Sequence, residues 1–528
     1  LSDKDETNPE YAKRRFDAFC KWNKELLVQT QCIEAQAVIA FLDTFDPQTA
    51  REHPVIADHL DELLKGRNLI FKLDGQEGYV HEHPEIRRVW EAYKTSAGNQ
   101  VHGQCLITGE PAPVARLHAS LQGVYGANSS GASLVGFNAR AYESYNKAKG
   151  QGLNSPVSEK AAFAYTTVLN HLLSPDNENL KIRLGDTTVV YWAESSDKIY
   201  ETIFSGLFEP DWFIPETSEE EIPGVDKKAV QRIKQIAEKI RSAQQMDTKM
   251  LLDGLDENTR FYVLGLSPNA ARVSVRFFHM DPFVKIIQKI MAHYQDMQID
   301  KEFDDQQNWI SVRRILEETV SKKSSDKSAS PLMSGAVFRA ILTNSPYPAA
   351  LYNAIINRIR ADMDDEKKYI RKINYVRSAV IKAFLIRKYR NYPQHPFKEV
   401  LIMSLNEQST IPAYLLGRLF AVLEKVQKEA VPDAKATIKD RYFTSACASP
   451  KSVFPTLLRL SQHHISKAEY GYASDNRIQD ILNLLDVEKN PIPARLNLDE
   501  QGIFVLGYYH QRAAFYLPKN KDEDVETE

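Results

Sequence analysis

Residues 322–331 read Lys-Lys-Ser-Ser-Asp-Lys-Ser-Ala-Ser-Pro, a run of small, polar and charged residues that is typical of a linker. Before it, short apolar or alternating runs that predict strands are mixed with segments of helical periodicity. After it, residues 332–516 show helical periodicity broken by prolines and almost no strand pattern. The sequence therefore predicts an α+β N-terminal domain over residues 1–321, followed by an all-α C-terminal helical-bundle domain.

The all-α part divides further by its composition. Residues 332–402 form a predicted helical region that contains a strongly basic segment. Residues 403–528 begin at Met403 and contain a run of predicted helices that could fold as a bundle of their own.

Length and composition exclude several classes of protein. The chain has 528 residues, of which 43% are hydrophobic and 26% are charged, as in ordinary globular proteins. No apolar run reaches the roughly 18 residues that a membrane span requires, so we do not expect an integral membrane protein. The four cysteines are scattered and form no C-x-x-C motif, which argues against a disulfide framework and favours a reducing, cytoplasmic compartment: Cys20, Cys32, Cys105 and Cys447. The chain opens at Leu1 without a methionine, so we expect a truncated N-terminus.

Bulk charge does not indicate a nucleic-acid-binding protein, because the net charge is −3. Phosphate binding depends on the local density of Lys and Arg, so any such role must come from local patches. Three segments are candidates.

The first candidate is a glycine-rich segment, residues 123–138. Within it, Gly126-Ala-Asn-Ser-Ser-Gly-Ala-Ser133 has the glycine and serine spacing of a phosphate-binding P-loop. Ala132 stands where that motif has its lysine, and no helical pattern follows directly, so ATP hydrolysis is disfavoured. Two interpretations remain: a turn between two elements, or a loop whose small residues allow close approach to a nucleic-acid backbone or groove edge. The candidate DNA-binding residues here are Asn128, Ser129, Ser130, Gly131 and Ser133.

The segment after this loop extends the first candidate. Asn138 is a good N-cap for a helix that we predict to run to Lys149. The further candidate DNA-binding residues are Asn138 itself and three basic residues of this helix, Arg140, Lys147 and Lys149. A solvated helix face explains these charges as well as a phosphate contact does.

The second candidate is a predicted hairpin. Residues 260–266 and 272–280 read as two strands around Ser267-Pro-Asn-Ala. The alternation places Arg272, Ser274 and Arg276 on one face of the second strand, and Val273, Val275 and Phe277 on the other. An exposed sheet edge would explain the two arginines as well as RNA contact.

The third candidate is the strongest charge feature of the chain. Residues 367–390 contain nine basic residues and no acidic one. On a helix, six of these fall within an arc of about 140°, opposite an apolar face: Lys367, Lys368, Arg371, Lys372, Lys382 and Arg390. We therefore predict an amphipathic helix whose basic face binds a nucleic-acid backbone, with an acidic protein partner or a membrane surface as alternatives.

Catalytic and metal-binding patterns are weak. His81-Glu82-His83 lacks the H-E-x-x-H spacing and is followed by Pro84, and His463 and His464 are adjacent, which is a poor geometry for a metal pair. The chain has no G-x-S-x-G motif. We assign no catalytic residue, no metal ligand and no cofactor, and we expect a protein that is not an enzyme.

Several long, separated motifs resemble one known family. They are Cys105-Leu-Ile-Thr-Gly-Glu110, Ala115-Arg-Leu-His118, the segment 126–138, Pro156 to Asn170, Phe261 to Phe277 and Pro346-Tyr-Pro-Ala-Ala350. Together they resemble the large subunit of the type I-C CRISPR Cascade surveillance complex, across most of the chain. Members of this family have an additional N-terminal stretch before the region that matches Leu1.

The resemblance implies a non-catalytic role in antiviral defence. The family's large subunit reads the protospacer-adjacent motif (PAM) in duplex DNA, helps to open the duplex, and supports R-loop formation, while the guide RNA reads the target sequence. The implied partners are the guide RNA (CRISPR RNA), the target double-stranded DNA and its displaced strand, the other Cascade subunits, and a separate helicase–nuclease. In this family the C-terminal part is also made as a free small subunit by internal translation, here from near Met403.

Two other function classes stay open from the residues alone. One is a metal-dependent nucleic-acid enzyme such as a nuclease, whose ligand cluster the sequence does not reveal. The other is a helical adaptor that binds only protein.

Overall fold

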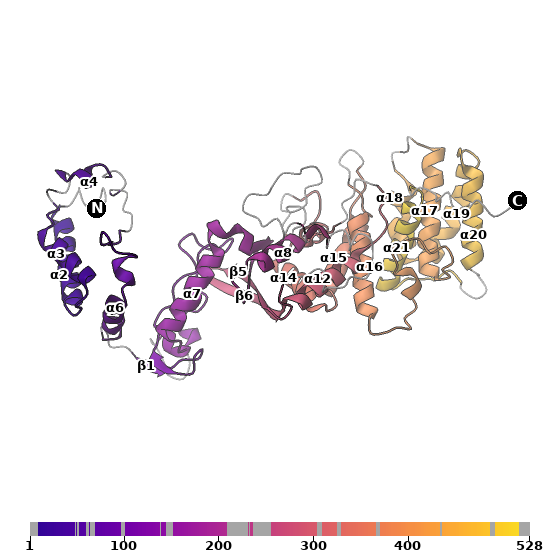
Figure 1. Ribbon diagram of the computed structural model, residues 1–528. Helices are drawn as coiled ribbons and strands as arrows, with labels where there is room; N and C mark the ends of the chain where they lie inside the picture. The colour runs from indigo at the N-terminus through magenta and orange to yellow at the C-terminus, as the bar shows by residue number, and fades with distance from the viewer. Residues whose placement is uncertain are drawn as a thin grey trace. The chain divides into compact units, whose positions relative to one another are not determined.

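The computed structural model divides the chain into two compact units (Figure 1). Unit 1 contains residues 1–117 and 137–163, and unit 2 contains residues 118–136 and 164–528. The structure describes residues 9–47, 49, 52–59, 63, 69–96, 101–137, 139–143, 151–208, 231, 233–235, 255–303, 309–324, 329–365, 370–432, 434, 436–485 and 491–516. None of the helices within these ranges combines the length and hydrophobicity needed to cross a membrane.

Unit 1 is a small helical assembly with a short hairpin. Its helices are α2 (Pro9–Leu27), α3 (Ile33–Thr44), α4 (Pro54–Ala57) and α6 (Pro84–Ser96), and its strands are β1 (His102–Gln104) and β2 (Pro111–Pro113). Proline at the start of α6 suits a first turn, where no backbone N–H is needed. The core between the helices is small: Leu27, Ala35, Val38, Leu42, Val80 and Ile86.

Unit 2 contains a four-stranded antiparallel sheet in the order β3-β4-β5-β6. The strands are β3 (Lys181–Leu184), β4 (Thr187–Ala193), β5 (Arg260–Asn269) and β6 (Arg272–Pro282). The predicted hairpin is confirmed, with Asn269 paired to Arg272 across the turn. The register shifts between Gly265 and Leu266, where β6 carries one extra residue.

The central strands of this sheet, β4 and β5, are covered on both faces, whereas β6 leaves Val275, Phe278 and Met280 exposed. Val189, Tyr191 and Phe261 point into a large cluster shared with the helices. Val190, Leu264, Leu266 and Val273 point the other way, into a cluster with Leu169, Leu172 and Leu173 of α7 (Glu159–Leu173). Since both faces of β4 are covered, its sequence is a nearly continuous apolar run.

The other described regular elements of unit 2 are helices, and beyond residue 331 this agrees with the sequence prediction. Its helices are α8 (Ile199–Phe208), α12 (Phe283–Met297), α13 (Val312–Glu317), α14 (Pro331–Thr343), α15 (Ala349–Ala361), α16 (Tyr375–Tyr389), α17 (Pro412–Ala430), α18 (Ile438–Ala448), α19 (Pro450–Ile465), α20 (Gly471–Leu485) and α21 (Leu498–Ala513). The predicted fold class, α+β followed by an all-α part, is confirmed. The large cluster includes residues on both sides of residues 322–331, among them Leu316 and Phe338.

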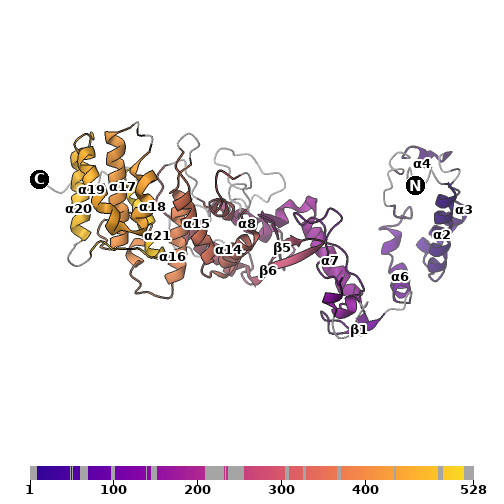
Figure 2. The same cartoon turned by 180° about the vertical axis from the view of Figure 1, so that it is seen from behind.

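Helix α17 is the centre of the C-terminal bundle. It packs against α19, α20 and α21, and α17, α19 and α20 lie side by side in both ribbon views (Figures 1 and 2). A Cβ on Gly417 would lie 2.0 Å from the carbonyl oxygen of Phe504 in α21, so only glycine permits this approach.

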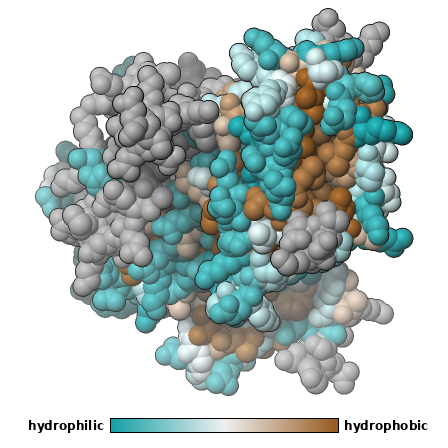
Figure 3. Space-filling view, turned by 90° about the vertical axis from the view of Figure 1, so that its right-hand side faces the viewer, coloured by the Kyte–Doolittle hydropathy of each residue, from teal (hydrophilic) through white to brown (hydrophobic). Residues whose placement is uncertain are grey.

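Seen from the side of α19 and α20, a band of hydrophobic residues is bordered by hydrophilic ones (Figure 3).

Candidate nucleic-acid interface

Two β-bridges hold the glycine-rich loop at its base. The backbone N–H groups of Leu121 and Ala132 each donate to the carbonyl oxygen of the other, at 2.9 Å. Next to this pair, the Val273 N–H of β6 donates to the Ser133 carbonyl oxygen at 3.0 Å. The structure therefore brings together two of the segments that the sequence singled out, the loop and the hairpin.

Ala132 and Gly131 have structural roles. The Ala132 side chain is buried in the cluster beneath the loop. Gly131 has φ +92°, and a Cβ there would lie 2.8 Å from the Ser120 Cβ. Ala132 is paired with Leu121, and the described residues 133–137 that follow form no helix, so the geometry differs from a P-loop. Gly131 is therefore unsuitable for a test substitution, because a larger residue at this position would strain the loop itself.

The tip of the loop is exposed to solvent. Asn128, Ser129 and Ser130 are exposed, Gly131 and Ser133 are half-buried, and the Gly131 N–H donates to the Asn128 carbonyl oxygen at 2.8 Å. Small polar side chains therefore stand on a turn whose base is fixed by the core.

An arginine and a tyrosine that the sequence analysis missed lie beside this loop. The exposed guanidinium of Arg183, on β3, lies over the ring of Tyr125. The Tyr125 N–H donates to Thr188 Oγ1 at 3.0 Å, which ties the loop to β4. The sequence held one signal for this arginine. In residues 181–184, Lys181 and Arg183 alternate with two apolar residues that are buried, which is the pattern of a strand whose basic side chains point to solvent.

The arginines of the hairpin are half-buried. Arg272 lies at the bridge to Ser133, next to the loop. Arg276 lies against α14. A Cβ placed on Gly335 of that helix would be only 3.7 Å from the Arg276 Cβ. The prediction that Phe277 faces away from these arginines is wrong. The extra residue of the β-bulge shifts the alternation of side chains, so Phe277 points to the same face of the sheet as the arginines, into the large cluster.

Little of the predicted helix after the loop lies within the described residues, and no α-helix is formed over residues 139–143. Asn138, Lys147 and Lys149 lie outside the described residues. Arg140 begins a short 3-10 helix, Arg140–Tyr142, which belongs to unit 1.

The predicted basic face is wrong for the described part of residues 367–390. Lys367 and Lys368 lie outside the described residues, and α16 begins only at Tyr375, with the Asn374 side chain as its cap. Four basic side chains of the segment are buried, with exposed fractions of 1–3%: Lys372, Arg377, Lys382 and Arg387. These side chains offer no surface to a nucleic-acid backbone.

Acidic residues from other parts of the chain neutralise this segment. Arg377 is bound by Glu318 and Asp362, each at 2.7 Å, and Arg387 by Asp296 at 2.7 Å. The two arginines at its ends are partly exposed but also paired, Arg371 with Glu302 at 2.8 Å and Arg390 with Asp296 at 2.9 Å. Residues 367–390 contain no acidic residue, and the acidic partners of their arginines come from elsewhere in unit 2.

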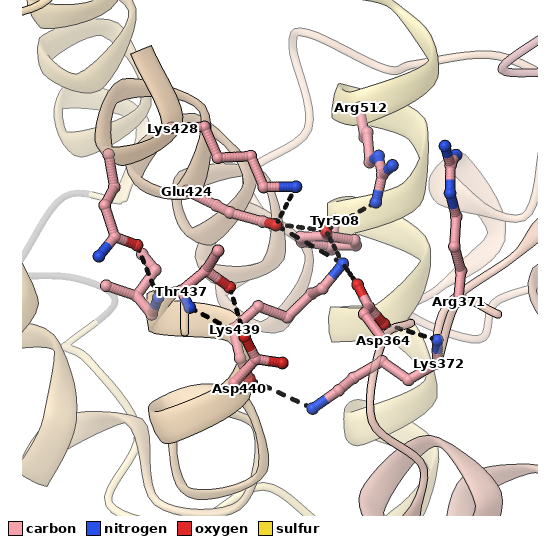
Figure 4. Close-up of polar contacts among 12 residues, drawn as sticks. Asp364, Arg371, Lys372, Glu424, Lys428, Thr437, Lys439, Asp440, Tyr508 and Arg512 are labelled. Atoms are coloured by element: carbon pink, nitrogen blue, oxygen red, sulfur yellow. Dashed lines mark hydrogen bonds and ion pairs between the residues drawn. The ribbon is translucent and has the colours of Figure 1, made fainter. Parts of the chain in front are cut away.

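Figure 4 shows the buried network that continues from this segment into the C-terminal bundle. Lys439 is paired with Asp364 and lies 3.5 Å from Glu424, and its Nζ donates to the Tyr508 hydroxyl oxygen at 3.3 Å. Tyr508 in turn donates to Glu424, and the Lys372 N–H donates to Asp364 at 2.8 Å. The network therefore joins the basic segment to α17, α18 and α21.

Burial and pairing shift the pKa values of this network in opposite directions. Burial alone would raise the pKa of Glu424, but Lys439, Lys428 and Arg512 outweigh it and lower that pKa to about 2. Burial lowers the pKa of Lys372, and Asp364 opposes this shift. These groups have the surroundings of structural ion pairs.

Lys382 is the exception, because burial lowers its pKa to about 8 with only Asp296 opposing. We expect Lys382→Met to raise the free energy of unfolding at pH 7 by about 2 kcal/mol, since an apolar side chain of similar length removes a buried charge. The folded-state pKa lies below the unfolded value of 10.5, so this penalty is full below pH 8 and disappears as the pH rises to 10.5.

Denaturant unfolding at pH 7 and pH 10 would measure both effects. The control is Lys388→Met, whose side chain on the same helix is 43% exposed. A loss of stability in Lys382→Met at pH 7 would show that the charge is better solvated than this structure implies.

A family model described as CRISPR-associated protein (Cas_Csd1) matches residues 1–516. No curated protein matches the chain.

Proposed function

Since the chain belongs to the Cas_Csd1 family of CRISPR-associated proteins, we propose that it is the large, non-catalytic subunit of a type I-C RNA-guided DNA surveillance complex. In this role it reads the PAM in duplex DNA, helps to open the duplex, stabilises the R-loop, and licenses recruitment of a separate helicase–nuclease. Target sequence is read by guide RNA pairing, so the protein needs only a small surface for the PAM and contacts to the backbone.

The observation that supports PAM reading is the exposed tip of the glycine-rich loop, Asn128 to Ser130. Its small side chains can approach a groove floor, and the bridges at Ala132 and Ser133 hold it in place. Arg183 supplies a positive charge beside it, and Arg272 adjoins Ser133. A preformed turn with a cation at its flank has the donors needed for base edges and phosphates.

We expect Ser129→Phe combined with Ser130→Phe to weaken binding to duplex DNA that carries the motif, by about 5- to 150-fold, the equivalent of about 1–3 kcal/mol. The bulky rings would keep the loop out of the groove, while folding should be unaffected because both side chains are exposed. The measurement is the affinity of the assembled, guide-loaded complex for duplexes with and without the motif.

Ser452→Phe is the matched control, because Ser452 is exposed on α19. It should bind the motif duplex as the wild type does. Equal affinity of the loop variant and the wild type would remove the loop from PAM reading.

A helical adaptor that binds only protein is the competing function, and one observation favours it. The described basic side chains of residues 370–390 are buried or paired within the chain, so the strongest charge feature does not support nucleic-acid binding. Purification of the chain with its sister subunits, followed by sequencing of bound RNA, separates the two. A short guide RNA in the complex supports the surveillance subunit, and a stable complex without RNA supports the adaptor.

A further inference from the structure

Three side chains with metal-binding atoms meet in unit 1, where α3 and α6 begin. Cys32 Sγ, a carboxylate oxygen of Glu34 and a ring nitrogen of His83 all lie within 4.8 Å of one another. The closest measured pair is His83 Nε2 and Glu34 Oε2, at 3.8 Å. All three residues are half-buried, so the site is shielded but reachable from solvent.

The local fold explains why residues far apart in sequence converge here. Cys32 is the N-cap of α3, and Glu34 lies in the first turn of the same helix. His83 immediately precedes Pro84, the first residue of α6. Val38 of α3 and Ile86 of α6 belong to the same small core, so packing brings the two helix starts together.

We propose that Cys32, Glu34 and His83 bind a single zinc ion. Thiolate, imidazole and carboxylate are the three ligand types that proteins use for zinc, and three protein ligands leave a fourth, tetrahedral position for water. Ligand atoms about 2.0–2.3 Å from zinc are about 3.3–3.7 Å from one another. The His83–Glu34 separation already approaches this spacing, and the cysteine needs a shift of about 1 Å at most.

Zinc binding changes the protonation of two ligands. The Cys32 thiol, which now donates to Thr30 Oγ1 at 3.8 Å, releases its proton to solvent as the thiolate binds zinc. His83 must also rearrange. The Glu85 N–H now donates to His83 Nδ1 at 3.3 Å, which leaves the ring proton on Nε2. A metal at Nε2 needs that nitrogen unprotonated, so the ring proton moves to Nδ1 and this long hydrogen bond is lost. The contact is weak at this length, and one coordinate bond more than replaces it.

The size of the core indicates what the ion would do. Among the residues that the structure describes, the buried apolar cluster of α3, α6 and their neighbours has six members, with four partly buried residues packed against it. A core of this size is little for holding several helices together. A metal that joins the start of α3 to the start of α6 would stabilise this packing as a disulfide would, without an oxidising compartment. The site is thus a structural cross-link of unit 1, independent of the proposed role in DNA recognition.

The test uses the full chain, purified without metal and titrated with Zn²⁺ or Co²⁺. We expect one bound equivalent, an absorption band of thiolate-to-cobalt charge transfer, and a higher midpoint of thermal unfolding with Zn²⁺. Cys32→Ser and His83→Gln should each weaken zinc binding by more than about 100-fold. Cys20→Ser and His81→Gln are the matched controls, because Cys20 is half-buried against the same core and His81 is near in sequence, and neither belongs to the site.

A measurement on the wild-type chain guards against variants that fail to fold. Zn²⁺ should slow alkylation of Cys32 and leave that of Cys20 unchanged, as read by mass spectrometry of peptides. Zinc binding that survives Cys32→Ser, or equal alkylation of Cys32 with and without Zn²⁺, would overturn the proposal. In that case the cluster is only a polar contact between His83 and Glu34 with a thiol beside it.

Discussion

Replacing Arg377 by methionine should lower the free energy of unfolding at pH 7 by about 3–5 kcal/mol. The Arg377 side chain is 1% exposed, and its guanidinium donates to Glu318, Asp362 and the Lys372 carbonyl oxygen at 2.7, 2.7 and 2.9 Å. Methionine has a similar length but leaves the two carboxylates without their buried partner. Glu318 and Asp362 would keep only Lys322, at 3.1 Å, and Arg358, at 3.3 Å, as partners. Carboxylates that lose their main buried partner are costly because the low-dielectric interior cannot replace the lost hydration.

The control for Arg377 is Arg313→Met, on α13. That arginine is 78% exposed and pairs with Glu317 at 3.3 Å, an arrangement that contributes about 0.3–0.5 kcal/mol. Adding Glu318→Gln and Asp362→Asn to Arg377→Met should recover part of the loss, because the uncompensated charges disappear. If Arg377→Met costs no more than Arg313→Met in denaturant unfolding, the buried position of this side chain is wrong.

The second large effect is a pH-dependent one at Glu424. We expect Glu424→Gln to destabilise the protein by about 3 kcal/mol at pH 7, because the amide cannot neutralise Lys439, which is 1% exposed in its side chain. The folded-state pKa of about 2 lies below the ordinary value of 4.5. The stability that Glu424 contributes is therefore present above pH 4.5 and is lost as the pH falls toward 2.

Denaturant unfolding of both proteins at pH 7, 4.5 and 3 would show this directly: the difference between wild type and Glu424→Gln should narrow toward the lowest pH. Glu317→Gln is the control, since that side chain is 47% exposed and should change stability little at each pH. A constant difference across this range would mean that Glu424 acts through packing and not through its charge.

The glycine-rich loop shows how far sequence alone could reach toward a site. Its small, polar composition predicted a loop that allows close approach, and Asn128 to Ser130 are exposed in the structure. The lack of a helical pattern directly after Ser133 argued against a P-loop, and in the structure Ala132 pairs with Leu121. The neighbouring Arg183 and Tyr125 were missed, because their stacking depends on how β3 and the loop are placed in space. The zinc ligands were missed for the same reason: Cys32 and His83 are far apart in the chain and form no spacing motif.

The sequence by itself determined the fold class, the hairpin of β5 and β6, and the helices beyond residue 331, because hydrophobic periodicity and turn residues act over a few neighbouring positions. Only the tertiary structure decided what the basic residues of 370–390 do. A helical wheel counts the charges within one segment and assigns an unpaired set to solvent. In the folded chain, acidic residues from other parts of unit 2 pair with the four arginines of that segment: Glu318, Asp362, Asp296 and Glu302. Arg377 and Arg387 are buried in these pairs, while Arg371 and Arg390 stay partly exposed. Coulomb attraction acts through space, so a run without acids in sequence can still be neutral in the fold.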